Sequence, residues 1–141
     1  MAEGALSPAP TPSGDETVLL VEDDDAVRAV AGRTIKRLGY SVLSASGGHE
    51  ALELAQNHGE TIHLLLTDIM MPGMNGVELS RKLAVLLPRT RVLFMSGYAD
   101  QDLIREGLLE PGTSFLAKPF TPQELGQKIR DVLRDGKLDG S

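Results

Sequence analysis

Five short apolar runs alternate with amphipathic segments along this chain, and this alternation constrains the fold more than any other feature of the sequence. The runs cover residues 17–21, 41–45, 63–67, 91–95 and 114–117. They have the length of β-strands and lack regular polar alternation, which is typical of strands covered on both faces. A strict strand-helix alternation implies parallel strands joined by right-handed crossovers. The sequence therefore predicts a doubly wound α/β fold, in which a five-stranded parallel sheet has helices on both faces.

Apolar residues recur at helical spacing in the segments between these runs. Helices are expected near residues 27–38, 51–55, 77–87 and 125–133, with a short, weaker one after residue 100. Gly39 and Pro88 supply the stops of the first and third helices. Thr121 is expected to cap the last helix, with Pro122 at its first helical position.

The two ends of the chain differ from this alternating part. Residues 1–16 are rich in proline, glycine, serine and alanine, which predicts a flexible linker or tail. Residues 136–141 are similarly expected to form a flexible C-terminal tail. Residues 17–135 then form one domain, because a chain of 141 residues with 41% hydrophobic residues is ordinary for a single core.

Composition argues against several classes of function. The formal net charge of -6 disfavours attraction to nucleic acid or anionic lipid. The absence of cysteine excludes disulfides, thiolate metal sites and cysteine nucleophiles, and fits a cytoplasmic protein. No apolar run approaches the roughly 18 to 20 residues that span a bilayer. We therefore expect a domain without direct nucleic acid or membrane contact.

Polar side chains come at the ends of four of the five runs. Glu22 and Asp23 follow the first run, Asp68 the third, Ser96 the fourth and Lys118 the fifth. Because the carboxyl ends of parallel strands share one edge of the sheet, these side chains are expected to converge there. If the strand order is 2-1-3-4-5, it reverses between the first and third strands, which sets Glu22 and Asp23 beside Asp68.

This set of side chains suggests phosphoryl chemistry. Carboxylates without a neighbouring histidine or cysteine ligand suit a hard cation, and Mg²⁺ is the natural choice. Such a cation also accounts for the acidic run at residues 22–25, whose mutual repulsion is otherwise costly. Lys118 would add a positive charge and Ser96 a hydrogen-bond donor for a phosphoryl group. Asp68 would be the nucleophile, forming an acyl phosphate.

Other interpretations stay open for the same residues taken singly. An acidic run before a helix commonly caps it, and Asp24 or Asp25 is expected to do so here. Asp68 could cap the turn that follows it, while Ser96 and Lys118 could be an ordinary strand-end hydroxyl and a surface amine. The methionines of residues 70–74 are expected to pack or to line the loop. Surface or core roles, not catalysis, are expected for the three histidines, because they lack the spacing of metal ligands: His49, His58 and His63.

Four motifs at compatible spacing carry a family resemblance. They read "VLLVEDDDAVR", "LLLTDIMMPGMNGVEL", "VLFMSGYAD" and "FLAKPFTPQEL". Together they cover essentially the whole folded unit, which resembles a response-regulator receiver domain (CheY-like). "FMSGYAD" followed by "GLLEPGTSFLAKPFT" is similar in particular to the C-terminal receiver of hybrid sensor histidine kinases. The resemblance implies a flavodoxin-like fold with strand order 2-1-3-4-5.

The resemblance also implies roles for individual residues. Asp68 would accept phosphate from a phosphohistidine on a histidine kinase or a histidine phosphotransfer protein. Mg²⁺ would be held by Glu22, Asp23 and Asp68, together with the backbone carbonyl of Met70. Glu22 stands where aspartate is frequent in the family, so its longer side chain would reach the metal through water.

Further positions follow from the same resemblance. Ser96 would bond the phosphoryl group and Lys118 would pair with it, with a cis peptide bond before Pro119. Ser96 and Phe115 would be the switch residues, and Phe115 lacks the hydroxyl of the tyrosine that is common there. The residues that would tune dephosphorylation are Met70 and Tyr98.

The leading hypothesis is a phosphorylation switch that acts on its own Asp68 and has no external substrate. It would be the receiver of a hybrid histidine kinase or a stand-alone regulator, and it would act through proteins, either as a monomer or as a homodimer formed on phosphorylation. No DNA-binding segment is expected after the last helix. An alternative from another class is a Mg²⁺-dependent phosphohydrolase with an aspartyl-phosphate intermediate, although Met70 stands where such enzymes carry a second acid. A pseudo-receiver that binds only proteins is a third possibility, and it predicts an incomplete site.

Overall fold

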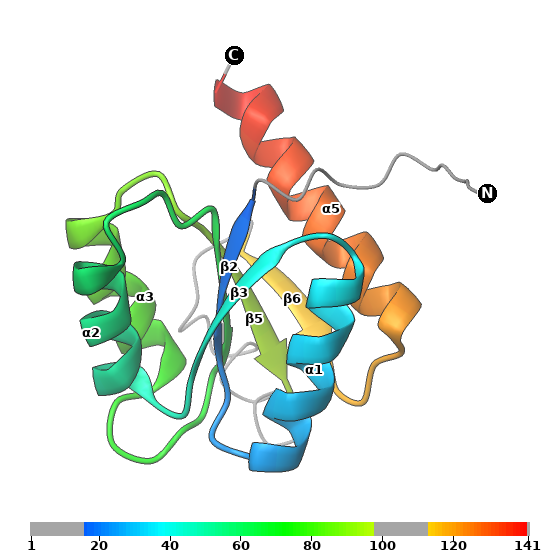
Figure 1. The fold of residues 1–141 in the computed structure, drawn as a ribbon, viewed down its shortest axis with the longest axis horizontal. Helices are drawn as coiled ribbons and strands as arrows, with labels where there is room; N and C mark the ends of the chain where they lie inside the picture. The colour runs from blue at the N-terminus through cyan, green and yellow to red at the C-terminus, as the bar shows by residue number, and fades with distance from the viewer. Residues whose placement is uncertain (1–15, 98–112, 141) are drawn as a thin grey trace.

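The computed structural model describes residues 16–97 and 113–140, with side chains as far as residue 134. Tyr98 and the short helix predicted after residue 100 lie outside these residues. The observed elements are β2 (Thr17–Val21), α1 (Asp25–Arg37), β3 (Ser41–Ala45), α2 (Gly48–His58), β4 (Leu64–Asp68), α3 (Gly76–Leu86), β5 (Arg91–Ser96), β6 (Ser114–Ala117) and α5 (Pro122–Gly140), as Figure 1 shows.

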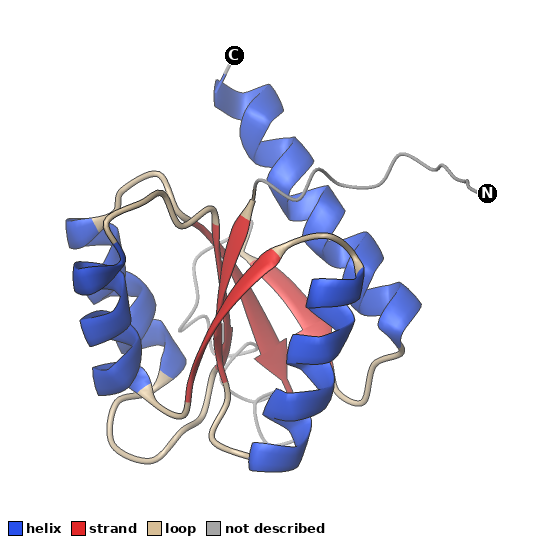
Figure 2. Cartoon of the chain, in the orientation of Figure 1, coloured by secondary structure: helices blue, strands red, loops and turns tan. Residues whose placement is uncertain are grey.

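The five strands form one sheet in the order β3-β2-β4-β5-β6, and every neighbouring pair is parallel. Counted along the chain this is the predicted order 2-1-3-4-5, with the reversal between β2 and β4. Figure 2 shows α1 and α5 on one face of the sheet and α2 and α3 on the other. The prediction of a doubly wound parallel sheet is confirmed.

Each face of the sheet has its own apolar layer. Successive residues of a strand point to opposite faces, so Leu20 packs with Ile35 and Ile129 under α1 and α5. Leu19 points the other way and packs with Leu79 under α2 and α3. All five residues of β2 and of β4 are buried, which explains why their sequences carry no polar alternation.

Side chains cap the N-termini of three helices. Asp24 accepts a hydrogen bond from the Val27 backbone N–H, which decides the choice between Asp24 and Asp25 as the cap of α1. The cap of α3 is Asn75, in a reciprocal capping box with its third helical residue. Thr121 caps α5 as predicted, since its hydroxyl accepts from the Glu124 backbone N–H at 3.0 Å.

Several element boundaries differ from the sequence prediction. β4 covers residues 64–68 and β5 ends at Ser96, so Asp68 and Ser96 are the last residues of their strands and do not follow them. Both are polar but stay in the ladder, where Asp68 pairs with Met95 and Ser96 with Ala117. α5 also continues through residues 136–140, beyond the predicted domain boundary, because no proline interrupts the chain after Pro122.

None of the helices in the described residues is long and apolar enough to cross a membrane.

Candidate functional site

Three carboxylates gather at the carboxyl edge of the sheet. Glu22 and Asp23 follow β2, Asp68 ends β4, and these strands are direct neighbours. One ligand oxygen from each of the three lies within 4.8 Å of the others. Glu22 and Asp68 are buried, with 1% and 5% exposure, whereas Asp23 is exposed. The structure thus brings together the three acids that the strand order placed side by side.

Lys118 follows the edge strand β6, and its side chain reaches this cluster. Its Nζ lies 2.8 Å from Glu22 Oε1 and 2.5 Å from Asp68 Oδ1. The Lys118 backbone N–H donates to the Ser96 carbonyl at 2.8 Å, which fixes the end of β6 beside the end of β5. The peptide bond between Lys118 and Pro119 is cis, as the family resemblance implies. The lysine therefore bridges two acids that lie at the carboxyl ends of two other strands.

The remaining predicted site residues differ in their position and in their burial. Ser96 is buried at the end of β5, one residue beyond the partner of Asp68 in the ladder. Phe115 lies within β6, half-buried, and its ring is 6.1 Å from that of Phe94. Met70 exposes 55% of its surface, two residues after Asp68. Met71 and Met74, in contrast, are buried in the apolar layer under α2 and α3, as expected for packing residues.

The ionisation of the two buried acids is coupled. Burial, followed by a hydrogen bond with Glu22, raises the pKa of the Asp68 carboxyl to about 8. Burial also opposes ionisation of Glu22, but hydrogen bonds with Asp68 and Lys118 leave its pKa below the usual value. Burial disfavours the charged form of Lys118 too, yet its bonds with the two acids outweigh this and raise its pKa. The metal-free pair therefore shares one proton, and Lys118 balances the remaining charge.

The donor set fits a magnesium ion. All the side chains in the cluster offer carboxylate oxygens, with no histidine or sulfur among them, as Mg²⁺ prefers. Two buried acids that must share a proton would both ionise if a divalent cation lay between them. Exposed Asp23 leaves one side of the cluster open to water, which Mg²⁺ usually keeps in its shell.

Gly76 lies against the backbone of Asp68, a contact that sequence reasoning missed. A Cβ built on this first residue of α3 would overlap the Asp68 carbonyl oxygen. The Gly76 backbone N–H also donates to the Ile69 carbonyl at 2.7 Å. In the sequence this glycine looks like a loop former after Asn75. Its position directly after a helix cap was the available signal for a close approach.

Arg28 is a second residue that the sequence did not single out. It lies in α1, and its guanidinium turns back to the acidic segment that precedes the helix. Nη1 donates to the Glu22 carbonyl at 2.7 Å, and Nη2 lies 2.6 Å from Asp25 Oδ1. The spacing of three residues between Asp25 and Arg28 predicts the ion pair but gives no sign of the bond to Glu22.

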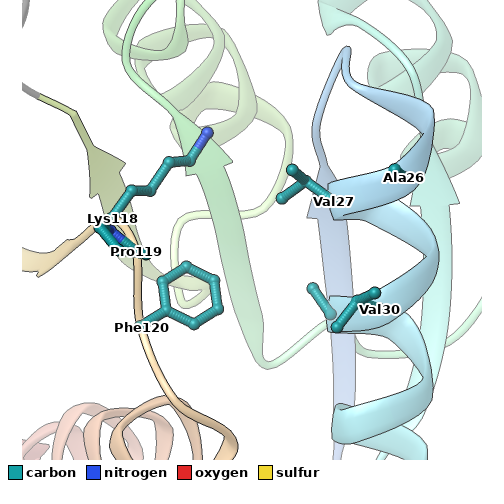
Figure 3. A pocket seen from close by; sticks show the side chains of 7 residues that line it. Ala26, Val27, Val30, Lys118, Pro119 and Phe120 are labelled. Carbon is teal, nitrogen blue, oxygen red and sulfur yellow. The ribbon is translucent and has the colours of Figure 1, made fainter.

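An apolar pocket of about 540 Å³ lies beside the site. Figure 3 shows the ring of Phe120 and the side chains of Val27 and Val30 around the same space, with the stem of Lys118 at its edge. Val30 is 53% exposed although it belongs to this apolar lining. The residues that line the pocket are Ala26, Val27, Val30, Ala31, Lys118, Pro119 and Phe120.

Known proteins resemble this chain in sequence. The chain matches the response regulator receiver domain family over residues 18–130. It is 38% identical over 121 residues to the sensor kinase CckA of Brucella abortus, an alignment that covers 86% of this chain and 13% of that protein. It is 34% identical over 116 residues to the response regulator receiver protein CpdR of the same organism, covering 82% of this chain and 95% of that one.

A solved structure is also similar to this chain. The crystal structure of the receiver domain from the hybrid histidine kinase CckA is 38% identical and superposes with a TM-score of 0.69, covering 83% of this chain and 98% of the other. The fold, the strand order and the family match thus point the same way. The chain belongs to the response regulator receiver domain family.

Proposed function

We propose that this receiver domain accepts a phosphoryl group on Asp68 from a phosphohistidine, within a two-component phosphorelay. The observation that carries the proposal is the contact of buried Asp68 with Lys118, next to two further acids. A carboxylate held beside a fixed cation in a largely buried site is suited to attack phosphorus and to keep the product.

The transfer can be written with its atoms balanced. One carboxylate oxygen of Asp68 attacks the phosphorus, the bond between phosphorus and the donor imidazole nitrogen breaks, and the electron pair stays on that nitrogen. Lys118, 2.5 Å from Asp68 Oδ1, would then pair with a phosphoryl oxygen. Ser96, at the end of the neighbouring strand, would donate a hydrogen bond to the same group. Slow hydrolysis of the acyl phosphate returns the domain to its starting state.

Magnesium completes this chemistry in our proposal. Glu22, Asp23 and Asp68 would hold it, with the Met70 backbone carbonyl as a further oxygen ligand. When bound, Mg²⁺ supplies positive charge for the phosphoryl oxygens as their charge redistributes during transfer. The shared proton of Glu22 and Asp68 must leave first, because both carboxylates are then needed as anions.

The apolar pocket beside Lys118 supports a protein phosphodonor. A histidine kinase or a histidine phosphotransfer protein would dock on α1 and on the segment of residues 118–120, which brings its phosphohistidine to the carboxyl edge of the sheet. The likeness to CckA favours the receiver of a hybrid histidine kinase, whereas the likeness to CpdR supports a stand-alone regulator as the alternative. Either form would work in the cytoplasm and have no external substrate.

Loading of Asp68 is proposed to switch a protein-binding face. Ser96 would move toward the phosphoryl group and Phe115, half-buried beside Phe94, would become more buried. This two-state change would repack the face near β6 and the start of α5. Dimerisation of the phosphorylated domain and tuning of its lifetime by Met70 and Tyr98 belong to the same proposal.

The test is the intact mass of the protein after incubation with acetyl phosphate, with and without Mg²⁺. The wild type is expected to gain one phosphoryl group in the presence of Mg²⁺ only. Asp68→Asn should gain none, because an amide cannot form the acyl phosphate. Asp131→Asn makes the same acid-to-amide change on α5, where Asp131 bonds Gln127, and should behave as the wild type.

Two outcomes would contradict the proposal. A gain that persists in Asp68→Asn would move the phosphorylation to another residue. If neither acetyl phosphate nor a phosphorylated histidine phosphotransfer protein loads the wild type, the chain would be a pseudo-receiver. Repeated turnover of a phosphate ester would instead revive the phosphohydrolase hypothesis.

A further inference from the structure

Arg28 places a positive charge against the backbone of the acidic segment. Its guanidinium bonds the Glu22 carbonyl at 2.7 Å and the Asp25 carboxylate at 2.6 Å. The Arg28 side chain is 22% exposed, while the Asp25 side chain is 89% exposed. The bond to Glu22 is therefore the more sheltered of the two, and it reaches the main chain of a residue whose carboxylate belongs to the metal cluster.

The charge of Arg28 alone would work against cation binding. A fixed positive charge close to a cation site lowers its affinity through like-charge repulsion. The exposed ion pair with Asp25, three residues earlier on α1, contributes little to stability. Neither effect explains the arrangement, whereas fixing the Glu22 main chain has a direct consequence for the carboxylates that follow it.

We propose that Arg28 is a positioning residue, which holds the turn of residues 22–25 so that the carboxylates of Glu22 and Asp23 face Asp68. This inference rests on the proposed magnesium-dependent function. A guanidinium presents several N–H donors in a rigid fork, so one side chain can hold a backbone carbonyl and a carboxylate together. The ammonium of a lysine is a compact point charge on a flexible stem and lacks this geometry.

Other bonds of the turn depend on the position of the Glu22 backbone. The Glu22 N–H donates to the Ala45 carbonyl at 3.1 Å, which ties it to β3. The Asp24 N–H donates to Glu22 Oε2 at 3.1 Å, so the turn also orients the Glu22 carboxylate. Asp24 in turn caps α1. Arg28 connects this turn to the helix through its side chain, which takes no part in the cap bond between Asp24 and Val27.

The experiment compares Arg28→Lys and Arg28→Gln with Arg33→Gln, by titrating Mg²⁺ into each metal-free protein in a calorimeter. Arg33 is exposed on the same helix, so its variant controls for the loss of one positive charge. Both Arg28 variants are expected to bind Mg²⁺ about 10-fold more weakly, as for other residues that orient metal ligands. Arg33→Gln should stay within about twofold of the wild type, because its charge is screened by solvent.

The sign of the effect separates positioning from electrostatics. If Arg28 acted only through its charge, Arg28→Gln would bind Mg²⁺ more tightly and Arg28→Lys would match the wild type. Either result would overturn the proposal. Arg28→Lys keeps the charge and the aliphatic stem, and it serves as the deciding variant should Arg28→Gln fail to fold by circular dichroism.

A second readout does not depend on the metal. In the presence of EDTA, amide hydrogen exchange at Asp24 should be about threefold faster or more in both Arg28 variants, because its acceptor Glu22 is less well held. Unchanged exchange would overturn the positioning role. A wild-type protein that binds no Mg²⁺ would instead overturn the proposed function, and the exchange measurement would still decide the role of Arg28.

Discussion

Burial and the neighbouring Glu22 oppose the ionisation of Asp68 more strongly than Lys118 favours it, although the proposed reaction needs the anion. In the metal-free protein its pKa of about 8 means that the carboxyl keeps a proton at neutral pH. A cation beside this carboxylate would stabilise its anion, so the proposed magnesium binding is coupled to loss of the proton.

This raised pKa predicts an unusual dependence of stability on pH. The unfolded chain has the ordinary pKa of 3.8, so between pH 3.8 and about 8 the folded state binds the extra proton. Ionisation of Asp68 in the folded state then costs free energy, and stability in EDTA should fall as pH rises through this window. Asp68→Asn removes that cost and should be more stable than the wild type by about 1–3 kcal/mol at pH 8, with little difference near pH 4.

Urea unfolding at several pH values, in EDTA, measures this difference. Lys118 keeps Glu22 as a partner in Asp68→Asn, so the variant does not leave a buried unpaired lysine. Addition of Mg²⁺ at pH 8 should stabilise the wild type more than the variant. A free energy of unfolding that is equal for the two proteins at pH 8, or lower for the variant, would contradict the proposed state of Asp68.

At the scale of the secondary-structure elements, α3 begins against the end of β4. This close approach needs a glycine, because a side chain on Gly76 would overlap the Asp68 carbonyl. β4, which ends at the proposed phosphoacceptor Asp68, and α3 are therefore positioned by one backbone contact, as well as by the apolar layer beneath them.

Gly76→Ala should move the start of α3 or the end of β4. We expect a loss of about 2–3 kcal/mol in the free energy of unfolding, as for other overpacked positions, together with weaker Mg²⁺ binding. Gly32→Ala is the matched control, since a Cβ there would make ordinary contacts of 3.8 Å and 3.9 Å with Leu20 and Ser44. Alanine in the interior of α1 should be neutral or slightly stabilising. Equal stability of the two variants would show that α3 adjusts freely.

The bounds of the elements also show how much of the fold could be predicted from the sequence. The apolar runs located all five strands to within one residue, because burial on both faces leaves a strong pattern. The boundaries were wrong at Asp68 and Ser96, where a polar residue takes part in the ladder. Convergence of the acids followed from strand order alone. The contacts of Gly76 and Arg28 did not, because they depend on the path of the backbone through turns, which residue spacing does not determine.

At the scale of the whole molecule, two apolar layers enclose one sheet, and the proposed site lies along one of its edges. The core residues that α5 contributes are Leu125, Ile129 and Val132. They belong to the first three turns of a helix that continues to Gly140. Among the described side chains, the core residues of α5 thus fall inside the predicted domain of residues 17–135.

A chain of residues 16–135 should therefore fold and bind Mg²⁺ as the full chain does. We expect its free energy of unfolding to stay within about 0.5 kcal/mol of the full-length value, because the removed residues carry few large apolar side chains. Thermal unfolding with and without Mg²⁺ checks this. A chain ending at residue 128 is the control, since it lacks Ile129 and Val132 and should be strongly destabilised. A large loss of stability in the chain of residues 16–135 would show that the domain extends beyond these residues.

The bond between Lys118 and Glu22 joins residues 96 positions apart. During synthesis, Glu22 and Asp68 leave the ribosome well before Lys118, and until the lysine arrives the two acids have no counter-charge from β6. The last strand to be made therefore completes both the sheet and the charge balance of its edge. A chain that stops before β6 lacks this lysine, so it would lack the charge that we propose pairs with the phosphoryl group. Under the proposed function, the ability to hold phosphate then requires that synthesis has passed β6.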